Sequence, residues 1–136
     1  MTRYLGLAEY FWLAEQVTAV DVTTLVKASR VELADSALHA PAAGFGDEDF
    51  YPDVFDKAAV PCCRLAWNHP LPDGNNRAAW AALLLFIDLN EGSWEPDPPD
   101  VDKAEEAMSM VAAGEVDEEW LAAWLRQRVR FRPSQR

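Results

Sequence analysis

One segment of the chain, Asn76 to Leu89, is apolar on almost every face, and this feature constrains the fold most. A helix that is hydrophobic all round is buried in a protein core or in a membrane. The longest apolar stretch, Ala78 to Ile87, falls well short of the roughly 20 residues that a membrane span needs. The segment therefore predicts a central, buried helix, and Gly92 after it is the kind of residue that ends helices.

Five other segments repeat apolar residues at the spacing of a helix. The first predicted helix covers about 7–19, and a second, weaker one ends before Pro41. The third has Pro52 in its first turn and extends to Ala66. The fourth runs from Asp100 or Asp102 to Ala113, and the last begins at 117–119. Pro61 is expected to interrupt the third of these helices with a kink near 57–60. Glycines and small residues over 41–47 predict a loop or a short hairpin with Phe45 at its tip.

The chain has 136 residues, enough for one domain and too few for two ordinary ones. We therefore predict a compact, single-domain, all-α fold over 1–136, with at most a small hairpin. Twelve Lys and Arg residues against 23 Asp and Glu residues give a net charge of −11, and such a surface repels nucleic acid. No signal-peptide pattern is present, so we expect a soluble, cytoplasmic protein with no membrane contact and no direct nucleic-acid partner.

Two further features are interpreted as structural. Cys62 and Cys63 are adjacent, and a disulfide between neighbours is strained, so both are predicted to be reduced core residues. The C-terminal helix and basic tail, 117–136, place cations where the helix dipole favours them. The tail is predicted to be a solvated end, with a docking surface as the alternative. Its arginines are Arg126, Arg128, Arg130, Arg132 and Arg136.

Residues 69–77 form a loop that runs into the N-terminus of the buried helix, because two prolines and an Asp-Gly pair exclude regular structure. A helix N-terminus presents unpaired N–H groups and the positive end of the helix dipole, which bind phosphate oxygens. Gly74 permits close approach of phosphates, and the guanidinium of Arg77 can bind them. Asp73 suits a magnesium ion, and His69 can act as base for a hydroxyl that attacks phosphorus.

Each of these residues also has a purely structural interpretation. His69 and Pro70 can end a helix, the segment 73–75 can form a turn or a cap, and Arg77 can be solvated. For any single residue this interpretation is preferred. The presence of all of them within 69–77, next to the most buried helix, instead favours magnesium-assisted transfer from a nucleotide.

The loop resembles the active-site loop of the Fic/Doc superfamily, whose pattern is His-x-Phe-x-Asp/Glu-Gly/Ala-Asn-x-Arg. This chain has His69-Pro70-Leu71-Pro72-Asp73-Gly74-Asn75-Asn76-Arg77 at that place. Further matches, to the death-on-curing (Doc) branch, extend over nearly the whole chain. They are Tyr4-Leu5-x-Leu7-x-Glu9, Leu33-x-x-Ser36-Ala37-Leu38-x-x-Pro41, Phe45-Gly46 followed by Tyr51-Pro52, Lys57-Ala58-Ala59, Leu83-Leu84-Leu85-Phe86 and Val111-Ala112-Ala113-Gly114-Glu115.

The resemblance implies a compact helical toxin that uses ATP and Mg²⁺ to modify a hydroxyl of a target protein. Fic relatives transfer the nucleotidyl group. The Doc branch transfers the γ-phosphate to translation elongation factor Tu, so a kinase that inhibits translation is expected. The resemblance also implies that a separate, Phd-like antitoxin chain neutralises the toxin.

By position, the resemblance makes His69 the catalytic base and Asp73 the magnesium ligand. A flap over about 41–50, with Phe45 and Gly46 as its docking residues, would align the target backbone by strand addition. The residues expected to bind the nucleotide phosphates are Gly74, Asn75, Asn76 and Arg77, of which Arg77 is also counted as catalytic.

The chain departs from the superfamily pattern at several positions, one of which is Ala78 in place of the Thr that often follows the Arg in the Doc branch. Leu71 replaces the Phe that anchors the loop in the core, and Asn76 replaces the Lys of the Doc branch or the Gly of Fic enzymes. The second Arg of Fic enzymes is missing, because Trp80 stands at its place. Phosphoryl transfer is therefore preferred. The alternatives are nucleotidyl (AMP) transfer and a catalytically impaired module that mainly binds its antitoxin.

Overall fold

The computed structural model describes residues 1–133 of the chain. The α-helices in this range are α1 (Leu7–Thr18), α2 (Val22–Ala28), α3 (Val31–His39), α4 (Val54–Asn68), α5 (Asn75–Leu89), α6 (Val101–Ala112) and α7 (Glu118–Arg126). A 3₁₀ turn, η1 (Ala40–Ala42), precedes the strands β1 (Gly44–Phe45), β2 (Glu48–Asp49), β3 (Ser93–Trp94) and β4 (Val129–Arg130). The all-α prediction is confirmed. Among residues 1–133, no helix combines the length and the apolar character that crossing a membrane requires.

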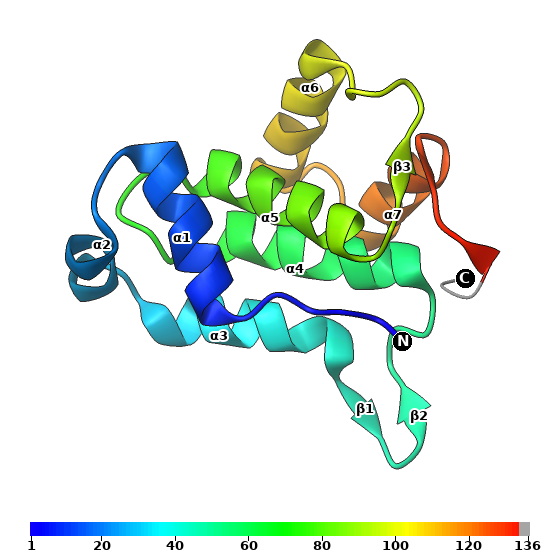
Figure 1. Ribbon diagram of the computed structural model, residues 1–136, viewed down its shortest axis with the longest axis horizontal. Coiled ribbons are helices and arrows are strands. Elements are labelled where there is room, and N and C mark those ends of the chain that lie inside the picture. Colours follow the sequence, from blue (N-terminus) through cyan, green and yellow to red (C-terminus); the bar gives the residue numbers. More distant parts are fainter. Residues whose placement is uncertain (134–136) are drawn as a thin grey trace.

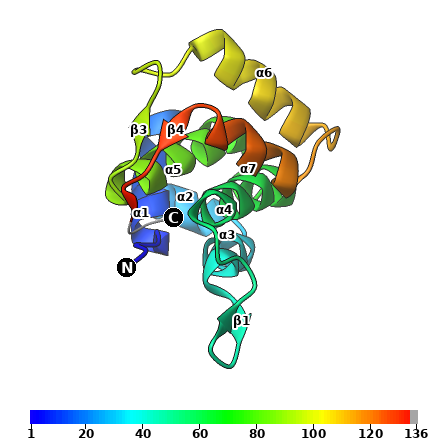
Figure 2. The ribbon, with the colours of Figure 1, turned by 90° about the vertical axis from the view of Figure 1, so that its right-hand side faces the viewer.

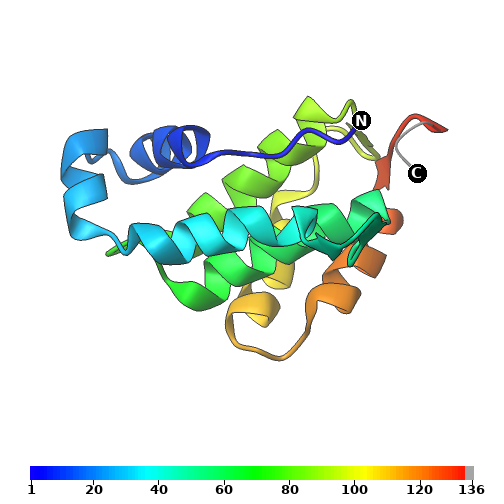
Figure 3. The same ribbon diagram turned by 90° about the horizontal axis from the view of Figure 1, so that it is seen from below.

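Helices α4 and α5 lie side by side at the centre of the fold, α1, α3, α6 and α7 pack around them, and α2 packs on α1 at one end (Figures 1 and 2). α3 and α7 pack against α4, and α1 packs against α5. Figure 3 shows α3 running along this central pair. α6 contacts both central helices from the opposite side to α1 (Figure 1). The segment that is apolar on almost every face therefore becomes the central helix α5, as its sequence predicts.

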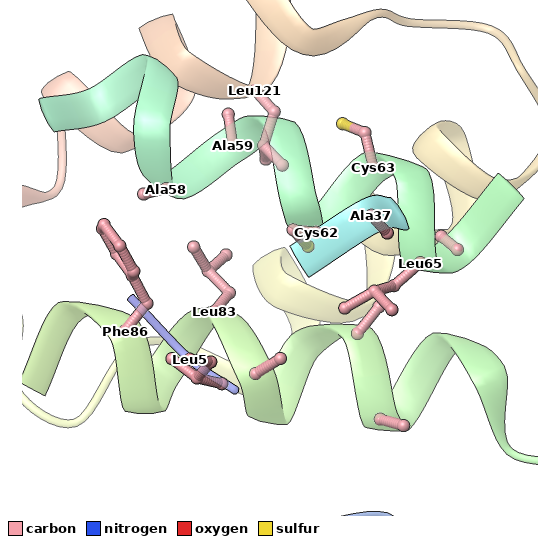
Figure 4. Packing of buried hydrophobic residues seen from close by; sticks show 14 of the residues in the cluster. Leu5, Ala37, Ala58, Ala59, Cys62, Cys63, Leu65, Leu83, Phe86 and Leu121 are labelled. Carbon is pink, nitrogen blue, oxygen red and sulfur yellow. The ribbon is translucent and has the colours of Figure 1, made fainter. Parts of the chain in front are cut away.

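The interface between α4 and α5 combines small and large side chains. Leu83 and Phe86 rise from α5 toward Ala58 and Cys62 of α4 (Figure 4). Small residues on both helices let the backbones approach closely, and the large ones fill the remaining space at the density of a protein interior. The buried small residues are Ala58, Ala59, Cys62, Cys63 and Ala66 of α4 and Ala78, Ala79 and Ala82 of α5.

The amide of Asn90 ties the N-terminal segment to the end of α5. Its side chain is fully buried. The amide oxygen accepts a hydrogen bond from the Arg3 N–H (2.8 Å), and the amide nitrogen donates to the carbonyls of Arg3 (2.9 Å) and Phe86 (2.8 Å). The polar atoms of this buried group are thus paired, as burial requires.

The sequence-based prediction for α4 is wrong at two points. The helix begins at Val54 rather than at Pro52, because the side chain of Asp53 caps a backbone N–H of the first turn (2.7 Å). Pro61 lies inside the helix and does not interrupt it. A proline there leaves the Lys57 carbonyl without its helical partner. Packing of α4 against α3, α5 and α7 compensates for that loss, since tertiary contacts supply most helical stability.

Two helices, α2 and α3, stand where the sequence predicts one weaker helix before Pro41. The Asp21 side chain accepts a hydrogen bond from the Thr24 N–H (3.1 Å) and so starts α2. The helix ends at Ser29, whose backbone is extended, and α3 begins after Arg30. This break creates a junction that lies against the loop between α4 and α5.

The basic tail is exposed to solvent, as predicted, but three of its arginines also form ion pairs that the sequence did not indicate. β4 pairs antiparallel with β3, so that Arg130 lies opposite Ser93. Exposed ion pairs of this kind contribute up to about 1 kcal/mol each, and the strand pairing adds backbone hydrogen bonds. The ion pairs are Arg126–Asp53 (3.2 Å), Arg130–Glu95 (3.7 Å) and Arg132–Glu91 (3.2 Å). Arg136, which the prediction included, lies outside the described residues.

Both cysteines are buried in α4, as predicted. Burial raises the pKa of Cys63 to about 12 and also raises the pKa of Cys62 well above its ordinary value. A thiol with a raised pKa is a poor nucleophile and a poor metal ligand near neutral pH. The pair therefore contributes packing to the core.

The hairpin β1–β2 projects from the body and is fastened by a buried lysine. Lys57 of α4 is 4% exposed, and its Nζ lies 3.0 Å from the Asp49 carboxylate on β2 and 3.5 Å from the Pro41 carbonyl. Burial alone lowers the pKa of Lys57, but the interactions with Tyr4 and Asp49 outweigh it, so the pKa is raised. Phe45 on β1 is 83% exposed.

Asp49→Asn is expected to destabilise the protein more than Lys57→Met does. The first change leaves a buried amine without its charged partner and costs about 1.5–3 kcal/mol, the range for hydrogen bonds to charged groups. The second replaces the amine by an apolar side chain of similar length, which is often close to neutral. Urea unfolding of both variants checks the order. A larger loss for Lys57→Met would contradict it.

Candidate functional site

The loop between α4 and α5 holds the predicted catalytic residues at one end of the central helix pair (Figure 1). His69 follows α4 in a left-handed conformation (φ 49°, ψ 56°), and Gly74 precedes α5 with φ 77°. A residue with a Cβ seldom adopts a positive φ, so the surroundings of His69 must hold it there. The side chains of His69 and Asp73 are exposed at the surface.

Gly74 is required at its position for two reasons. Its positive φ disfavours other residues. A Cβ would also lie 3.0 Å from the Thr18 side chain at the end of α1 and 3.7 Å from the guanidinium of Arg77. The start of α5 therefore packs directly against α1, with Arg77 beside it.

Two residues, Asn75 and Arg30, hold the loop backbone. The Asn75 amide binds Leu71 in both directions, accepting from its N–H and donating to its carbonyl, each at 3.0 Å. Arg30, from the junction of α2 and α3, donates its backbone N–H to the Pro70 carbonyl (2.8 Å) and its guanidinium to the His69 carbonyl (3.0 Å). Leu71 is 4% exposed and anchors the loop in the core despite being smaller than Phe.

The start of α5 offers hydrogen-bond donors to an anion. The first bond inside the helix runs from the Ala78 N–H to the Gly74 carbonyl (2.9 Å), which leaves the N–H groups of 75–77 outside the helical ladder. Arg77 is exposed and makes no hydrogen bond or ion pair with the rest of the described chain. Unpaired N–H groups and a free guanidinium together favour negative charge here.

A cleft of about 570 Å³ opens beside Arg77, between α5 and α6. One wall is a single face of α5, formed by Asn76, Arg77, Trp80 and Leu84. The opposite wall is formed by Pro98, Pro99, Val101, Ala104, Glu105, Met108 and Ser109. Its lining is mostly apolar, with Asn76 and Arg77 at the end near the loop. A pocket of this kind suits a small ligand that is apolar at one end and charged at the other.

The structure does not bring Phe45 and Gly46 to the loop. Their hairpin precedes the first residue of α4, whereas the loop follows the last, so the two lie at opposite ends of a 15-residue helix (Figure 1). At 1.5 Å per residue, that helix separates them by about 22 Å. The predicted docking of a target on this hairpin therefore lacks geometric support. The loop is instead contacted by the junction of α2 and α3 and, at Gly74, by the end of α1.

Asp73 is suited to bind Mg²⁺ together with phosphate oxygens and waters. Among residues 1–133, no group of three or more His, Cys, Asp or Glu side chains is placed to hold an ion by itself. Mg²⁺ is commonly bound by one or two carboxylates together with substrate phosphates and waters. A single exposed carboxylate next to a helix start that favours phosphate matches this donor set.

Sequence reasoning missed the contact of Arg30 with the loop and the place of Trp80 in the cleft wall. Arg30 lies 39 positions from His69 and belongs to no motif. Trp80 packs against Trp94 (5.6 Å between ring centroids) and Trp124 (6.2 Å) as well as lining the cleft. Spacing could have indicated Trp80, because it lies three positions after Arg77 and so on the same helix face. No local pattern could have indicated Arg30.

Comparison with known proteins identifies the family. Residues 8–87, more than half of the chain, match the sequence model of the Fic/DOC family. The chain belongs to the Fic/DOC family. A relative named Toxin Doc, from Mycolicibacterium smegmatis, is 43% identical over 93 residues, which cover 68% of this chain and 71% of the relative. The resemblance to the Doc branch is thereby confirmed.

The Fic/DOC match covers the elements that hold the loop. Residues 8–87 include α2, α3, α4 and nearly all of α1 and α5. Helix α6, the second wall of the cleft, lies after the matched range. The match thus covers the loop and the helices around it, whereas one cleft wall comes from sequence outside the match.

Proposed function

We propose that this Fic/DOC protein is the toxin of a type II toxin–antitoxin system and transfers the γ-phosphoryl group of ATP to a hydroxyl of a target protein. The observation that carries the proposal is a rigidly held loop, His69 to Gly74, beside a helix start that favours anions. The name of the M. smegmatis relative, Toxin Doc, supports the toxin assignment. The transferase assignment rests on the family.

In the proposed reaction, His69 takes the proton of the attacking hydroxyl. The hydroxyl oxygen forms a bond to the γ-phosphorus, the bond between that phosphorus and the bridging oxygen breaks, and ADP leaves. Backbone N–H groups of residues 75–77 and the guanidinium of Arg77 bind the phosphate oxygens, which the backbone at Gly74 lets approach closely. Asp73 would hold Mg²⁺, and the bound ion would neutralise phosphate charge. The side-chain amide of Asn75 is engaged with the loop, so its proposed share in phosphate binding is mainly through its backbone.

The cleft between α5 and α6 is the proposed place of the nucleoside. Its volume of about 570 Å³ lies within the usual range for small-molecule sites. Arg77 stands at the end of the cleft nearest the loop. One nucleotide can therefore place its phosphates at Arg77 and its sugar and base in the cleft. The apolar wall, including Trp80 and Leu84, suits a planar aromatic base.

Trp80 supports phosphoryl transfer over AMP transfer. It occupies the position of the second Arg of Fic enzymes, and an indole offers one N–H donor and no positive charge. Its ring also packs against Trp94 and Trp124, which makes it part of a fixed aromatic cluster. The site therefore retains one phosphate-binding guanidinium on this helix face, that of Arg77.

The proposed partners come from the family. A separate, Phd-like antitoxin would lay an amphipathic helix in an apolar groove and block the toxin. The proposed target is a protein of translation such as elongation factor Tu. The toxin would encounter the antitoxin and the target in the cytoplasm. Co-expression with the genomic neighbour tests the first of these proposals, since loss of toxicity is expected.

ATP radiolabelled in the α- or the γ-position tests the proposed reaction in a bacterial lysate. Label from γ-labelled ATP is expected on a protein, and none from α-labelled ATP. Transfer of the α-label would show AMP transfer instead. Transfer of neither label would identify a catalytically impaired module. Asp73→Asn serves as a matched control that keeps the shape of the loop residue and removes its charge.

Asn76→Lys is expected to raise transfer by about tenfold, because a charge-assisted hydrogen bond to phosphate contributes about 1.5–3 kcal/mol against about 1 for a neutral one. Asn76 is exposed, lines the cleft and does not cap α5, whose N-cap is Gly74. An unchanged thermal midpoint is therefore expected as well. ATP affinity, initial rate and midpoint are measured together, with Asn76→Gln as the neutral control. If Asn76→Lys leaves the ATP affinity unchanged and lowers the thermal midpoint, position 76 has no role in phosphate binding.

A further inference from the structure

The junction of α2 and α3 holds two consecutive carbonyl groups of the loop through one residue. Arg30 donates its backbone N–H to the Pro70 carbonyl (2.8 Å) and its guanidinium to the His69 carbonyl (3.0 Å). Pro70 has no N–H, so the peptide group between His69 and Pro70 can be held only through its carbonyl. Arg30 binds that carbonyl and the one after it.

The His69 carbonyl is the group that matters most for the position of the imidazole. Its orientation is set by the ψ angle of His69, and the residue is held at φ 49° and ψ 56°. The imidazole itself makes no hydrogen bond with any described residue, and the side chain is exposed. Within residues 1–133, the direction of the ring therefore depends on the backbone that carries it.

We propose that the Arg30 guanidinium is a positioning residue for His69, an inference that rests on the proposed function of His69 as the base. Arg30 would act through the backbone of His69, whose carbonyl it binds. This matters because a general base must be placed accurately to take a proton. A misplacement of about 1 Å can lower a rate by about 100-fold. The segment before α3 thus becomes part of the active-site support, in a place where the sequence carries no motif.

The test compares Arg30→Met, Arg30→Lys and the control Lys27→Met in the full chain. Arg30→Met removes the guanidinium and keeps the backbone bond to Pro70. Arg30→Lys retains the charge but loses the fork of donors. Lys27 lies near the same junction, is exposed and contacts no loop atom through a hydrogen bond, so Lys27→Met removes an equal charge from the same helix pair.

Transfer of the γ-label is the first readout. Arg30→Met is expected to lower kcat by about 10- to 100-fold and to leave the KM for ATP within about twofold. Arg30→Lys is expected to recover part of the loss, and Lys27→Met to match the wild type. An unchanged kcat in Arg30→Met, or an equal loss in Lys27→Met, would overturn the proposal.

Histidine-selective NMR is the second readout and needs no activity. The chain has two histidines, and His39 serves as internal reference because its ring is bound to the Asp35 carbonyl (2.9 Å). The His69 ring signals are expected to shift and broaden in Arg30→Met and to return toward the wild type in Arg30→Lys, with His39 unchanged. Unperturbed His69 signals in Arg30→Met would overturn the proposal even if kcat falls. Perturbed signals in a chain that transfers no label would uphold the positioning and refute the proposed function alone.

Discussion

His69→Ala is expected to lower the rate of transfer by about 10² to 10⁴, the usual effect of losing a positioned general base. The fold is expected to survive, because the side chain is exposed and makes no hydrogen bond with the described residues. Surface changes of this kind alter the free energy of unfolding by about 0.5 kcal/mol or less. Transfer of γ-label and urea unfolding are measured on the same preparation.

His69→Asn is the matched control for backbone strain at this position. Asn tolerates the left-handed conformation well and has no basic nitrogen at neutral pH. It should therefore be as inactive as His69→Ala and at least as stable. Wild-type turnover in either variant would remove His69 from the role of base.

Asn75→Ala is expected to damage stability and transfer together. The change leaves the N–H and the carbonyl of Leu71 without partners, and each such group costs about 1–3 kcal/mol, so a loss of about 2–6 kcal/mol is expected. The loop then loses its defined shape, and transfer should fall by about 100-fold. Urea unfolding and the labelled-ATP assay measure the two effects.

Two variants separate loop shape from direct phosphate binding. Asn75→Asp keeps the acceptor for the Leu71 N–H and loses the donor to its carbonyl, so an intermediate unfolding free energy is expected. Asn76→Ala removes the same kind of amide from the next position, where it makes no capping bond, and should leave stability unchanged. If Asn75→Ala weakens ATP binding without lowering stability, the amide serves the phosphates and not the loop.

The central helix and the loop could be predicted from the sequence because each has a strong local signal. Asn76 to Leu89 is apolar all round, and the prolines and the Asp-Gly pair of 69–74 exclude a continued helix. Gly44 and Gly46 indicated a loop or a short hairpin, and the structure has the hairpin. These features depend on residue types close together in the chain, which is where pattern-based reasoning is strongest.

The errors arose where packing outweighs local preference. Pro61 stays inside α4 because three neighbouring helices stabilise that helix. The strands β3 and β4 have two residues each, too few to show an alternating pattern, so the pairing of the basic tail was not visible. The bond from Arg30 to His69 needs α3 to lie along α4, and only the folded chain brings the two residues together.

The proposed phosphoryl transfer is tested most directly by the mass of a lysate protein that becomes labelled when this chain and ATP are added. One added phosphoryl group on a side-chain hydroxyl is expected with the wild type, and none with His69→Asn. An added nucleotidyl group, or an unchanged mass in every protein tested, would contradict the proposed reaction at the loop from His69 to Arg77.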